Sequence, residues 1–137
     1  MADSTGDIEL DGFRAEARAW LETNFPASLK GKAGQAYAAS EGGEFEGDLL
    51  AWKQRMGEKG WGAPTWPAKY GGGGLSGSQA RVLQQEMARA GAFNPMVQGM
   101  GITMIGPTIL DYGTEAQKQT HIPRIVKGEV RWCVGYS

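Results

Sequence analysis

The sequence is poor in the residues that build metal centres and disulfides. It contains one cysteine, Cys133, and one histidine, His121, among its 137 residues. A single cysteine excludes an internal disulfide, and a lone histidine gives no cluster at metal-ligand spacing. We therefore expect no structural metal. We interpret Cys133 as a small buried residue and His121 as a hydrogen-bond donor near a helix end.

Long apolar runs and a surplus of positive charge are also missing. No apolar run approaches the roughly 20 residues that span a bilayer, and residues 1–10 lack the basic and apolar regions of a secretory signal. The formal net charge is -1, so the composition does not favour binding to the phosphate backbone of a nucleic acid. These absences predict a cytoplasmic protein with neither a membrane nor a nucleic-acid partner.

What remains is the composition of one ordinary globular domain, with 41% apolar and 21% charged residues. The 22 glycines follow no repeat, so they predict turns, helix caps and sites of close packing. The length allows a real hydrophobic core but is short for an enzyme that must enclose a dinucleotide.

The first half of the sequence predicts two helices separated by a loop. Residues 1–10 have little to bury and are expected to form a flexible arm. Asp11 then caps a helix whose apolar residues recur at helical spacing as far as Asn24. Residues 27–47 show no period and predict a loop. Asp48 caps a second helix, which Gly60 closes.

Residues 61–75 predict a packed, irregular connector. They hold two tryptophans, two prolines and four consecutive glycines, which suit neither a regular helix nor a central strand. Ser76 with Gln79 three residues later forms a capping box, so a third helix is expected to start there and to end at Gly91.

The stretch after Pro95 is apolar on most sides, which predicts a fourth, buried helix. Gly106 and Pro107 are expected to kink or divide this helix. A second capping box at Thr114 starts a last helix, and Pro123 is expected to divide it.

The hydrophobic period changes from 3.6 to 2 only at the end of the chain. Apolar and polar residues alternate over Glu129–Tyr136, which predicts a strand. The expected fold class is therefore all-α, ending in the first strand of a further domain. A lone strand leaves backbone groups unpaired, so the sequence looks interrupted.

A glycine pattern and two glutamates are candidates for cofactor binding and catalysis, but their contexts favour structural roles. Gly72, Gly74 and Gly77 fit the pattern G-x-G-x-x-G, yet a dinucleotide loop must follow a buried strand, whereas Trp-Pro-Ala-Lys-Tyr stands before this one. Glu86 and Glu115 are lone helical carboxylates that we expect to face solvent, so neither has support as a general base.

Met96, Met100 and Met104 recur at i, i+4 and i+8 along the predicted fourth helix. Methionine stripes of this kind more often belong to a core than to a ligand pocket. Residue spacing alone thus predicts a helical domain without indicating a reaction.

Three segments resemble, in order and spacing, the acyl-CoA dehydrogenase family. Residues 60–72 (GWGAPTWPAKYGG) are similar to a family segment in which a helix ends in Gly-Trp and the chain passes through Trp-Pro to Tyr-Gly-Gly. Residues 108–118 (TILDYGTEAQK) resemble its Gly-x-Glu-x-Gln-Lys helix start. Residues 122–129 (IPRIVKGE) resemble its Leu-Pro-x-Leu-x-x-Gly-Glu turn into the middle domain.

The resemblance implies that residues 11–128 are the helical N-terminal domain and residues 129–137 the start of the middle β-domain of an FAD-dependent oxidoreductase of fatty acid metabolism. In the family, backbone groups and a hydroxyl near this strand end bond the flavin, and Val134, Tyr136 and Ser137 match those positions. The family's catalytic glutamate usually lies in a C-terminal bundle and has no counterpart here. The chain alone is therefore expected to be inactive.

The fourth helix lies beside the acyl chain in the family, so the resemblance makes Met96, Met100, Thr103 and Met104 candidate substrate contacts. Their interpretation as core residues stays open. The implied partners are an acyl-CoA substrate, further copies of the chain in a homo-oligomer, and an electron-transfer flavoprotein. The alternative is a free-standing helical binding or interaction module that keeps the fold without the reaction.

Overall fold

The computed structural model describes residues 4–40, 44–96 and 101–129. Within these ranges the chain is helical or irregular and contains no strand, which confirms the all-α fold class. Apart from Glu129, the strand predicted for Glu129–Tyr136 lies outside the described residues. The six α-helices and three shorter helices of the described ranges are α1 (Ser4–Asn24), η1 (Ala27–Leu29), α2 (Ala33–Ser40), α3 (Gly47–Lys59), η2 (Ala68–Tyr70), α4 (Gly77–Ala90), η3 (Gly101–Ile105), α5 (Gly106–Tyr112) and α6 (Glu115–Val126).

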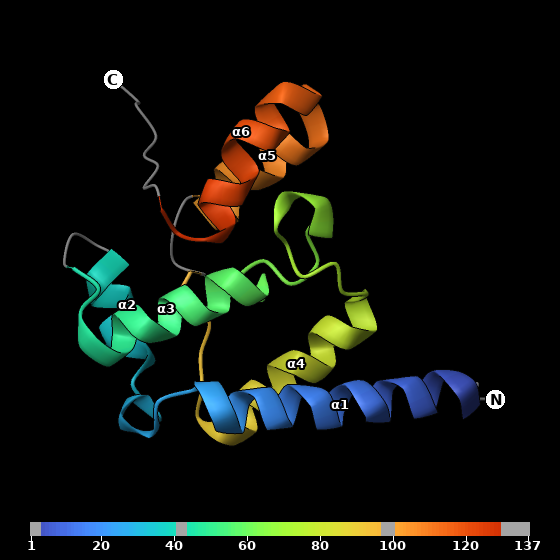
Figure 1. Cartoon of the computed structure of the whole chain (residues 1–137), viewed down its shortest axis with the longest axis vertical. Coiled ribbons are helices and arrows are strands. Elements are labelled where there is room, and N and C mark those ends of the chain that lie inside the picture. The colour runs from blue at the N-terminus through green and yellow to red at the C-terminus, as the bar shows by residue number, and fades with distance from the viewer. Residues whose placement is uncertain (1–3, 41–43, 97–100, 130–137) are drawn as a thin grey trace.

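Helices α1 and α4 lie side by side and run in the same direction (Figure 1). Arg14 near the middle of α1 reaches Gln85 on α4 at 2.7 Å, while the C-terminal ends of both helices line one pocket. Their apolar stripes meet in the main core, to which α2 and α3 also contribute. The side chains that form its centre include Ala17, Leu21, Trp52, Met56, Trp61 and Leu83.

Helix α1 begins at Ser4, so the helix start predicted at Asp11 is wrong. Residues 4–10 are helical rather than a preceding arm, and Leu10 packs against the main core. That contact extends the apolar stripe of α1 by one turn and helps to offset the cost of ordering the backbone.

The loop predicted over residues 27–47 contains two helices, η1 and α2, and is therefore also a wrong prediction. The reason is that α2 docks through small side chains, since Ala36 and Ala39 are buried in the main core. Alanine has the highest intrinsic helix propensity, but its small side chain gives only a weak hydrophobic pattern.

Helix caps follow the sequence closely, with one exception. Gly60 and Gly91 close α3 and α4 in the left-handed conformation, and both predicted capping boxes are present. Asp48, however, lies in the first turn of α3 rather than at its N-cap, which is Glu46. The Asp48 carboxylate accepts a hydrogen bond from Ser28, so it ties α3 to η1.

The α5–α6 pair forms a second layer at the opposite end of the molecule from α1 (Figure 1). The sequence predicts a kink or division at Gly106 and Pro107, but the backbone stays helical there, since Ile105 has helical φ and ψ angles of -70° and -46°. What changes at this point is the helix type, from the π-helix η3 to the α-helix α5. Pro123, in contrast, lies inside α6 and does not divide it. Its neighbours Ile122 and Val126 are fully buried in a second core with Ala63, Tyr70 and Ile125. Pro123 has no backbone N–H to donate within the helix, and we attribute the tolerance of this missing hydrogen bond to the packing of its neighbours.

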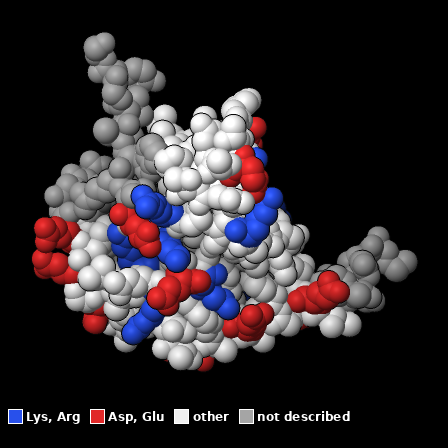
Figure 2. Space-filling model, turned by 45° about the horizontal axis from the view of Figure 1, so that its top comes forward, with Lys and Arg blue, Asp and Glu red and all other residues white. Residues whose placement is uncertain are grey.

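None of the helices in the described ranges is long and apolar enough to cross a membrane. On the face shown in Figure 2, basic side chains lie next to acidic ones. The positive charge visible in this view is therefore not gathered into a separate basic surface.

Candidate functional site

The four-glycine run folds back on the first half of the connector. The Gly73 amide donates to the Ala63 carbonyl at 3.0 Å, and the Gly74 amide donates to the Trp66 carbonyl at 2.9 Å. A methyl group on Gly72 would lie 2.4 Å from the Trp66 carbonyl oxygen, so only glycine fits. These amides are engaged within the connector, and a 3-10 helix rather than a strand precedes them. The geometry supports the structural interpretation of the G-x-G-x-x-G pattern.

A groove of about 660 Å³ lies between the connector and α4. We call it the connector groove. Trp61, Leu83 and Met87, which are at most 8% exposed, contribute to its lining. Arg81 and Gln84 add polar groups from α4. The size and the mainly apolar lining are typical of a site that takes an apolar group.

Met96 lies in the main core. Its side chain is 5% exposed and packs so closely on Gly57 and Gly62 that a methyl group on either would meet it at 3.3 Å. Asn94 fixes the turn, because its amide nitrogen donates to the Gly62 carbonyl at 2.9 Å and its oxygen accepts from the Met96 amide at 3.0 Å. The structure thus places Met96 as a core side chain.

Thr103 and Met104 lie on η3 in different surroundings from Met96. Both are exposed, and the Met104 side chain has 47% of its surface accessible. Met100 lies outside the described residues. The buried helix predicted from Pro95 onward is therefore wrong in two respects: residues 95–96 form a turn, and the face of η3 that carries Met104 is open. Local π-helical geometry is frequent at functional sites.

Glu86 was predicted to face solvent, and that prediction is wrong. Its side chain is 3% exposed rather than solvent-facing. Arg18 donates to it at 2.7 and 3.3 Å, and Arg14 donates at 2.8 Å. The hydrogen bond from Arg18, with help from Arg14, lowers the pKa of Glu86 to about 2 against the opposing effect of burial. The available signal was the i, i+4 spacing of the two arginines on α1.

Glu115 is exposed, as predicted, but it is not isolated. The Tyr70 hydroxyl donates to its carboxylate at 2.6 Å, and Lys69 lies 3.9 Å away. The hydrogen bond from Tyr70 lowers the pKa of Glu115 and, in return, raises the pKa of Tyr70. This pair ties the connector to the first turn of α6, where the helix dipole also favours a carboxylate.

The connector groove by itself does not fit FAD. The only charged side chain in the described lining of the connector groove is Arg81, whereas a dinucleotide requires donors for two phosphates and for the flavin ring. The positions predicted to contact the flavin, Val134, Tyr136 and Ser137, lie outside the described residues. The arrangement is better suited to an apolar group.

Comparison with known proteins gives a consistent picture. Residues 9–129 match the family described as "Acyl-CoA dehydrogenase, N-terminal domain". The chain is 35% identical over 130 residues to acyl-CoA dehydrogenase IpdE1 of Mycolicibacterium smegmatis, covering 95% of this chain and 33% of that protein. It is 41% identical over 83 residues to acyl-CoA dehydrogenase FadE26 of Mycobacterium tuberculosis, covering 61% of this chain and 20% of that protein.

A solved structure is similar as well. The steroid ACAD Tcur3481-Tcur3483 superposes with a TM-score of 0.59 at 32% identity, covering 90% of this chain and 30% of that chain. The chain thus spans about a third of the length of IpdE1 and of this solved chain. The family match runs over nearly all of the described helices and includes the three segments whose resemblance the sequence indicated. The chain belongs to the acyl-CoA dehydrogenase family, of which it represents the N-terminal domain.

Proposed function

We propose that this chain serves as the N-terminal domain of a flavin-dependent acyl-CoA dehydrogenase, which oxidises the Cα–Cβ bond of an acyl-CoA thioester. The proposal rests on the family match over residues 9–129, together with 35% identity to IpdE1 across 95% of the chain. In such an enzyme FAD would supply the hydride acceptor. The catalytic base and most of the flavin site would come from the two thirds of the relatives that this chain does not cover.

The contribution of this chain would be one wall of the acyl pocket. Thr103 and Met104 are exposed on η3, and with Met100 they would contact the acyl group. Met96 would support that wall from the core, where it packs against Gly57 and Gly62. Thioether side chains are flexible and polarisable, so they suit a pocket that must adapt to its occupant.

We further propose a bulky, ring-bearing acyl group as the substrate class. The support is the similarity to a solved steroid ACAD at 32% identity over 90% of this chain. A straight-chain fatty acyl group is the competing substrate class, and the open face of η3 accommodates either.

The cofactor contacts proposed for this chain lie at its end. Val134 and Tyr136 would meet the flavin through their backbones, and the Ser137 hydroxyl would donate to the ring. A hydrogen bond of this kind is worth on the order of 1 kcal/mol, so Ser137→Ala should weaken flavin binding in the complete enzyme. The 137-residue chain alone should neither retain FAD nor oxidise an acyl-CoA. Further copies of the chain and an electron-transfer flavoprotein are the proposed protein partners.

The test is to express the complete product of the gene and to assay reduction of an artificial electron acceptor. Steroid-ring and straight-chain acyl-CoA thioesters of matched solubility should be compared. Flavin-dependent turnover supports the proposal, and a higher kcat/KM for the ring-bearing thioester supports the substrate class. A folded product that binds no flavin and oxidises neither thioester would refute it.

The alternative remains a free-standing helical module that binds a partner without catalysis. The observation that favours this reading is the connector groove, whose described lining residues come from the connector, α4 and residues 92–94 of this chain. A stop codon directly after Ser137, combined with no flavin-binding companion chain co-purifying with the protein, would favour the module over the enzyme.

A further inference from the structure

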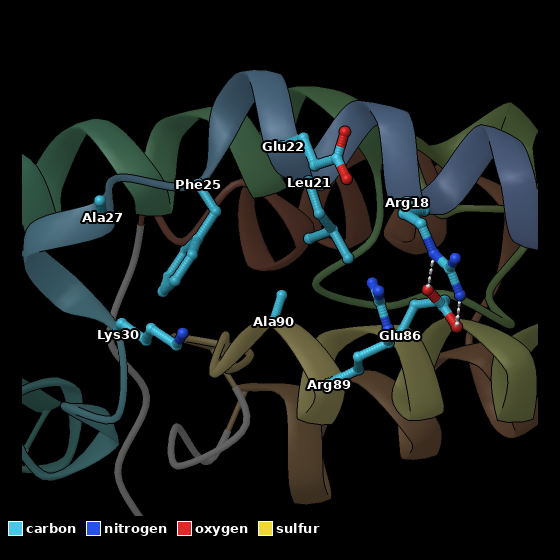
Figure 3. Close-up of a pocket in the computed structure, with 9 residues that line it drawn as sticks. All are labelled: Arg18, Leu21, Glu22, Phe25, Ala27, Lys30, Glu86, Arg89 and Ala90. Atoms are coloured by element: carbon cyan, nitrogen blue, oxygen red, sulfur yellow. Dashed lines mark hydrogen bonds and ion pairs between the residues drawn. The ribbon is translucent and has the colours of Figure 1, made fainter.

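The pocket between the C-terminal ends of α1 and α4 combines positive charge with an apolar surface. Its volume is about 200 Å³, and Figure 3 shows the side chains that line it. Leu21, Phe25 and Ala90 provide apolar surface, while Lys30 and Arg89 bring two cations from separate segments. This combination differs from the connector groove and from the η3 face.

The negative charge of Glu86, which lies at one side of this pocket, is compensated by its partners. Glu86 is held by both Arg14 and Arg18, and Figure 3 shows the Arg18 guanidinium bound to it. Two guanidinium groups against one carboxylate leave a surplus of one positive charge. Glu22, which interacts electrostatically with Arg18, offsets part of this surplus, and solvent screens it because both arginines are more than a third exposed.

The charged groups of Lys30 and Arg89 are unpaired within the described part of the chain. Neither forms an ion pair or a hydrogen bond through its side chain with other described residues. The Lys30 stem is held against the end of α4, since a methyl group on Gly91 would meet its Cγ at 2.5 Å. The guanidinium of Arg89 points into the gap between the two helices (Figure 3). Among the described lining residues, Glu86 is already paired with two arginines, which leaves Glu22 as the carboxylate opposing Lys30 and Arg89.

A purely structural reading of these cations exists. Arg89 lies in the last turn of α4, and a cation there offsets the negative end of the helix dipole. Lys30 is close enough to the same helix end to act likewise. That reading explains why each residue is basic, but it does not explain an apolar hollow between them.

We propose that this pocket binds a small carboxylate with an apolar body. The planar fork of a guanidinium matches a carboxylate in two parallel hydrogen bonds, and Phe25 and Leu21 offer the apolar body a surface. The volume is too small for a CoA thioester or a dinucleotide, because ligand pockets of drug-sized molecules span about 300–1,000 Å³. Inorganic phosphate would leave the apolar surface unused.

The test uses the 137-residue chain and benzoate as the probe, with binding followed by NMR chemical shifts. We expect saturable shifts at Leu21, Phe25 and Ala90 with a dissociation constant on the order of 1 mM. The double variant Lys30→Gln/Arg89→Gln should weaken binding at least about tenfold. Arg124→Gln is the matched control, because it removes the same charge from the last turn of α6, which does not line this pocket, and should leave the affinity unchanged. Circular dichroism checks that each variant is folded.

A second variant keeps the proposal testable if the double variant does not fold. Glu22→Gln removes the opposing carboxylate and should tighten benzoate binding several-fold. Benzyl alcohol, which has the ring without the charge, should show no saturation. The proposal is overturned if benzoate does not saturate, if inorganic phosphate binds as tightly, or if Arg124→Gln weakens binding as much as the double variant. None of these outcomes bears on the acyl-CoA dehydrogenase function.

Discussion

The Arg18 Nε atom lies 2.7 Å from Oε1 of the buried Glu86 carboxylate. This contact joins α1 to α4 through two residues that are 68 positions apart in the sequence. Arg14 binds the same carboxylate at 2.8 Å. A buried carboxylate that loses its partners is destabilising, whereas a buried ion pair adds little stability compared with apolar groups of similar volume. The ion-pair cluster of Arg14, Arg18 and Glu86 therefore fixes the relative position of α1 and α4 more than it adds net stability.

The first prediction is that the stability of the domain falls at acid pH because of Glu86. Its folded pKa of about 2 lies below the ordinary value of 4.5, so its contribution is fully present above pH 4.5 and is lost as pH falls through 2. The two arginines are 35% and 42% exposed, and solvent screening reduces the contribution to about 2 kcal/mol. Urea unfolding across this range should show the loss. In the Glu86→Gln variant the free energy of unfolding should change less with pH. An unchanged pH dependence would contradict the role assigned to Glu86.

The second prediction concerns the link between the connector and α6. Tyr70→Phe removes the hydroxyl that donates to Glu115, so the pKa of Glu115 should rise toward its ordinary value. NMR titration of the Glu115 side-chain carboxyl carbon measures this directly. Tyr112→Phe is the control, because Tyr112 is 87% exposed and should leave the Glu115 titration as it was. An equal shift in both variants would argue against the contact.

The third prediction tests why the connector needs its glycines. A methyl group on Gly73 would lie 2.6 Å from the Pro64 carbonyl oxygen, while the same group on Gly77 meets nothing within 4 Å. Gly73→Ala should therefore cost about 1–3 kcal/mol in the free energy of unfolding through overpacking. Gly77→Ala, at the start of α4, should be neutral or stabilising by up to about 1 kcal/mol. Chemical denaturation measures the free energy of unfolding of both variants. An equal loss of this free energy in the two would contradict the account.

Sequence patterns predicted the parts of the fold that depend on local chemistry. The capping boxes at Ser76 and Thr114 and the glycine C-caps at Gly60 and Gly91 are set by hydrogen bonds within a few residues, so they could be identified without the tertiary structure. Helix α2 could not, because its stability depends on docking two alanines into a core built by distant segments.

The same distinction applies to the candidate site. The environment of Glu86 depends on arginines about 70 residues earlier in the chain, a contact that no local period encodes. Met96 and Met104 share an i, i+8 relation in sequence, yet one is buried and the other exposed. The predicted stripe assumed a continuous α-helix, whereas residues 95–96 form a turn and residues 101–105 a π-helix.

The fourth prediction separates Met96 from Met104 by function. Met96 is 5% exposed, so Met96→Ala should cost about 2–5 kcal/mol in stability, as truncation of a core methionine does. Met104 is 47% exposed, so Met104→Trp should leave the stability of the domain nearly unchanged. In the complete enzyme, the larger side chain at position 104 should reduce kcat/KM for the bulkier acyl-CoA relative to a shorter one, because it fills the proposed pocket.

Two measurements on each variant distinguish the pocket from the core. Thermal unfolding of the domain reports packing, and the ratio of kcat/KM values for a ring-bearing and a short-chain acyl-CoA reports the pocket. We expect Met104→Trp to change the ratio without changing the unfolding midpoint, and Met96→Ala to lower the midpoint. Thr108→Val serves as a control on the neighbouring turn, since the Thr108 hydroxyl donates to the backbone carbonyl of Met104 at 2.9 Å. If Met104→Trp leaves the ratio unaltered in a folded, flavin-loaded enzyme, the η3 face does not line the acyl site.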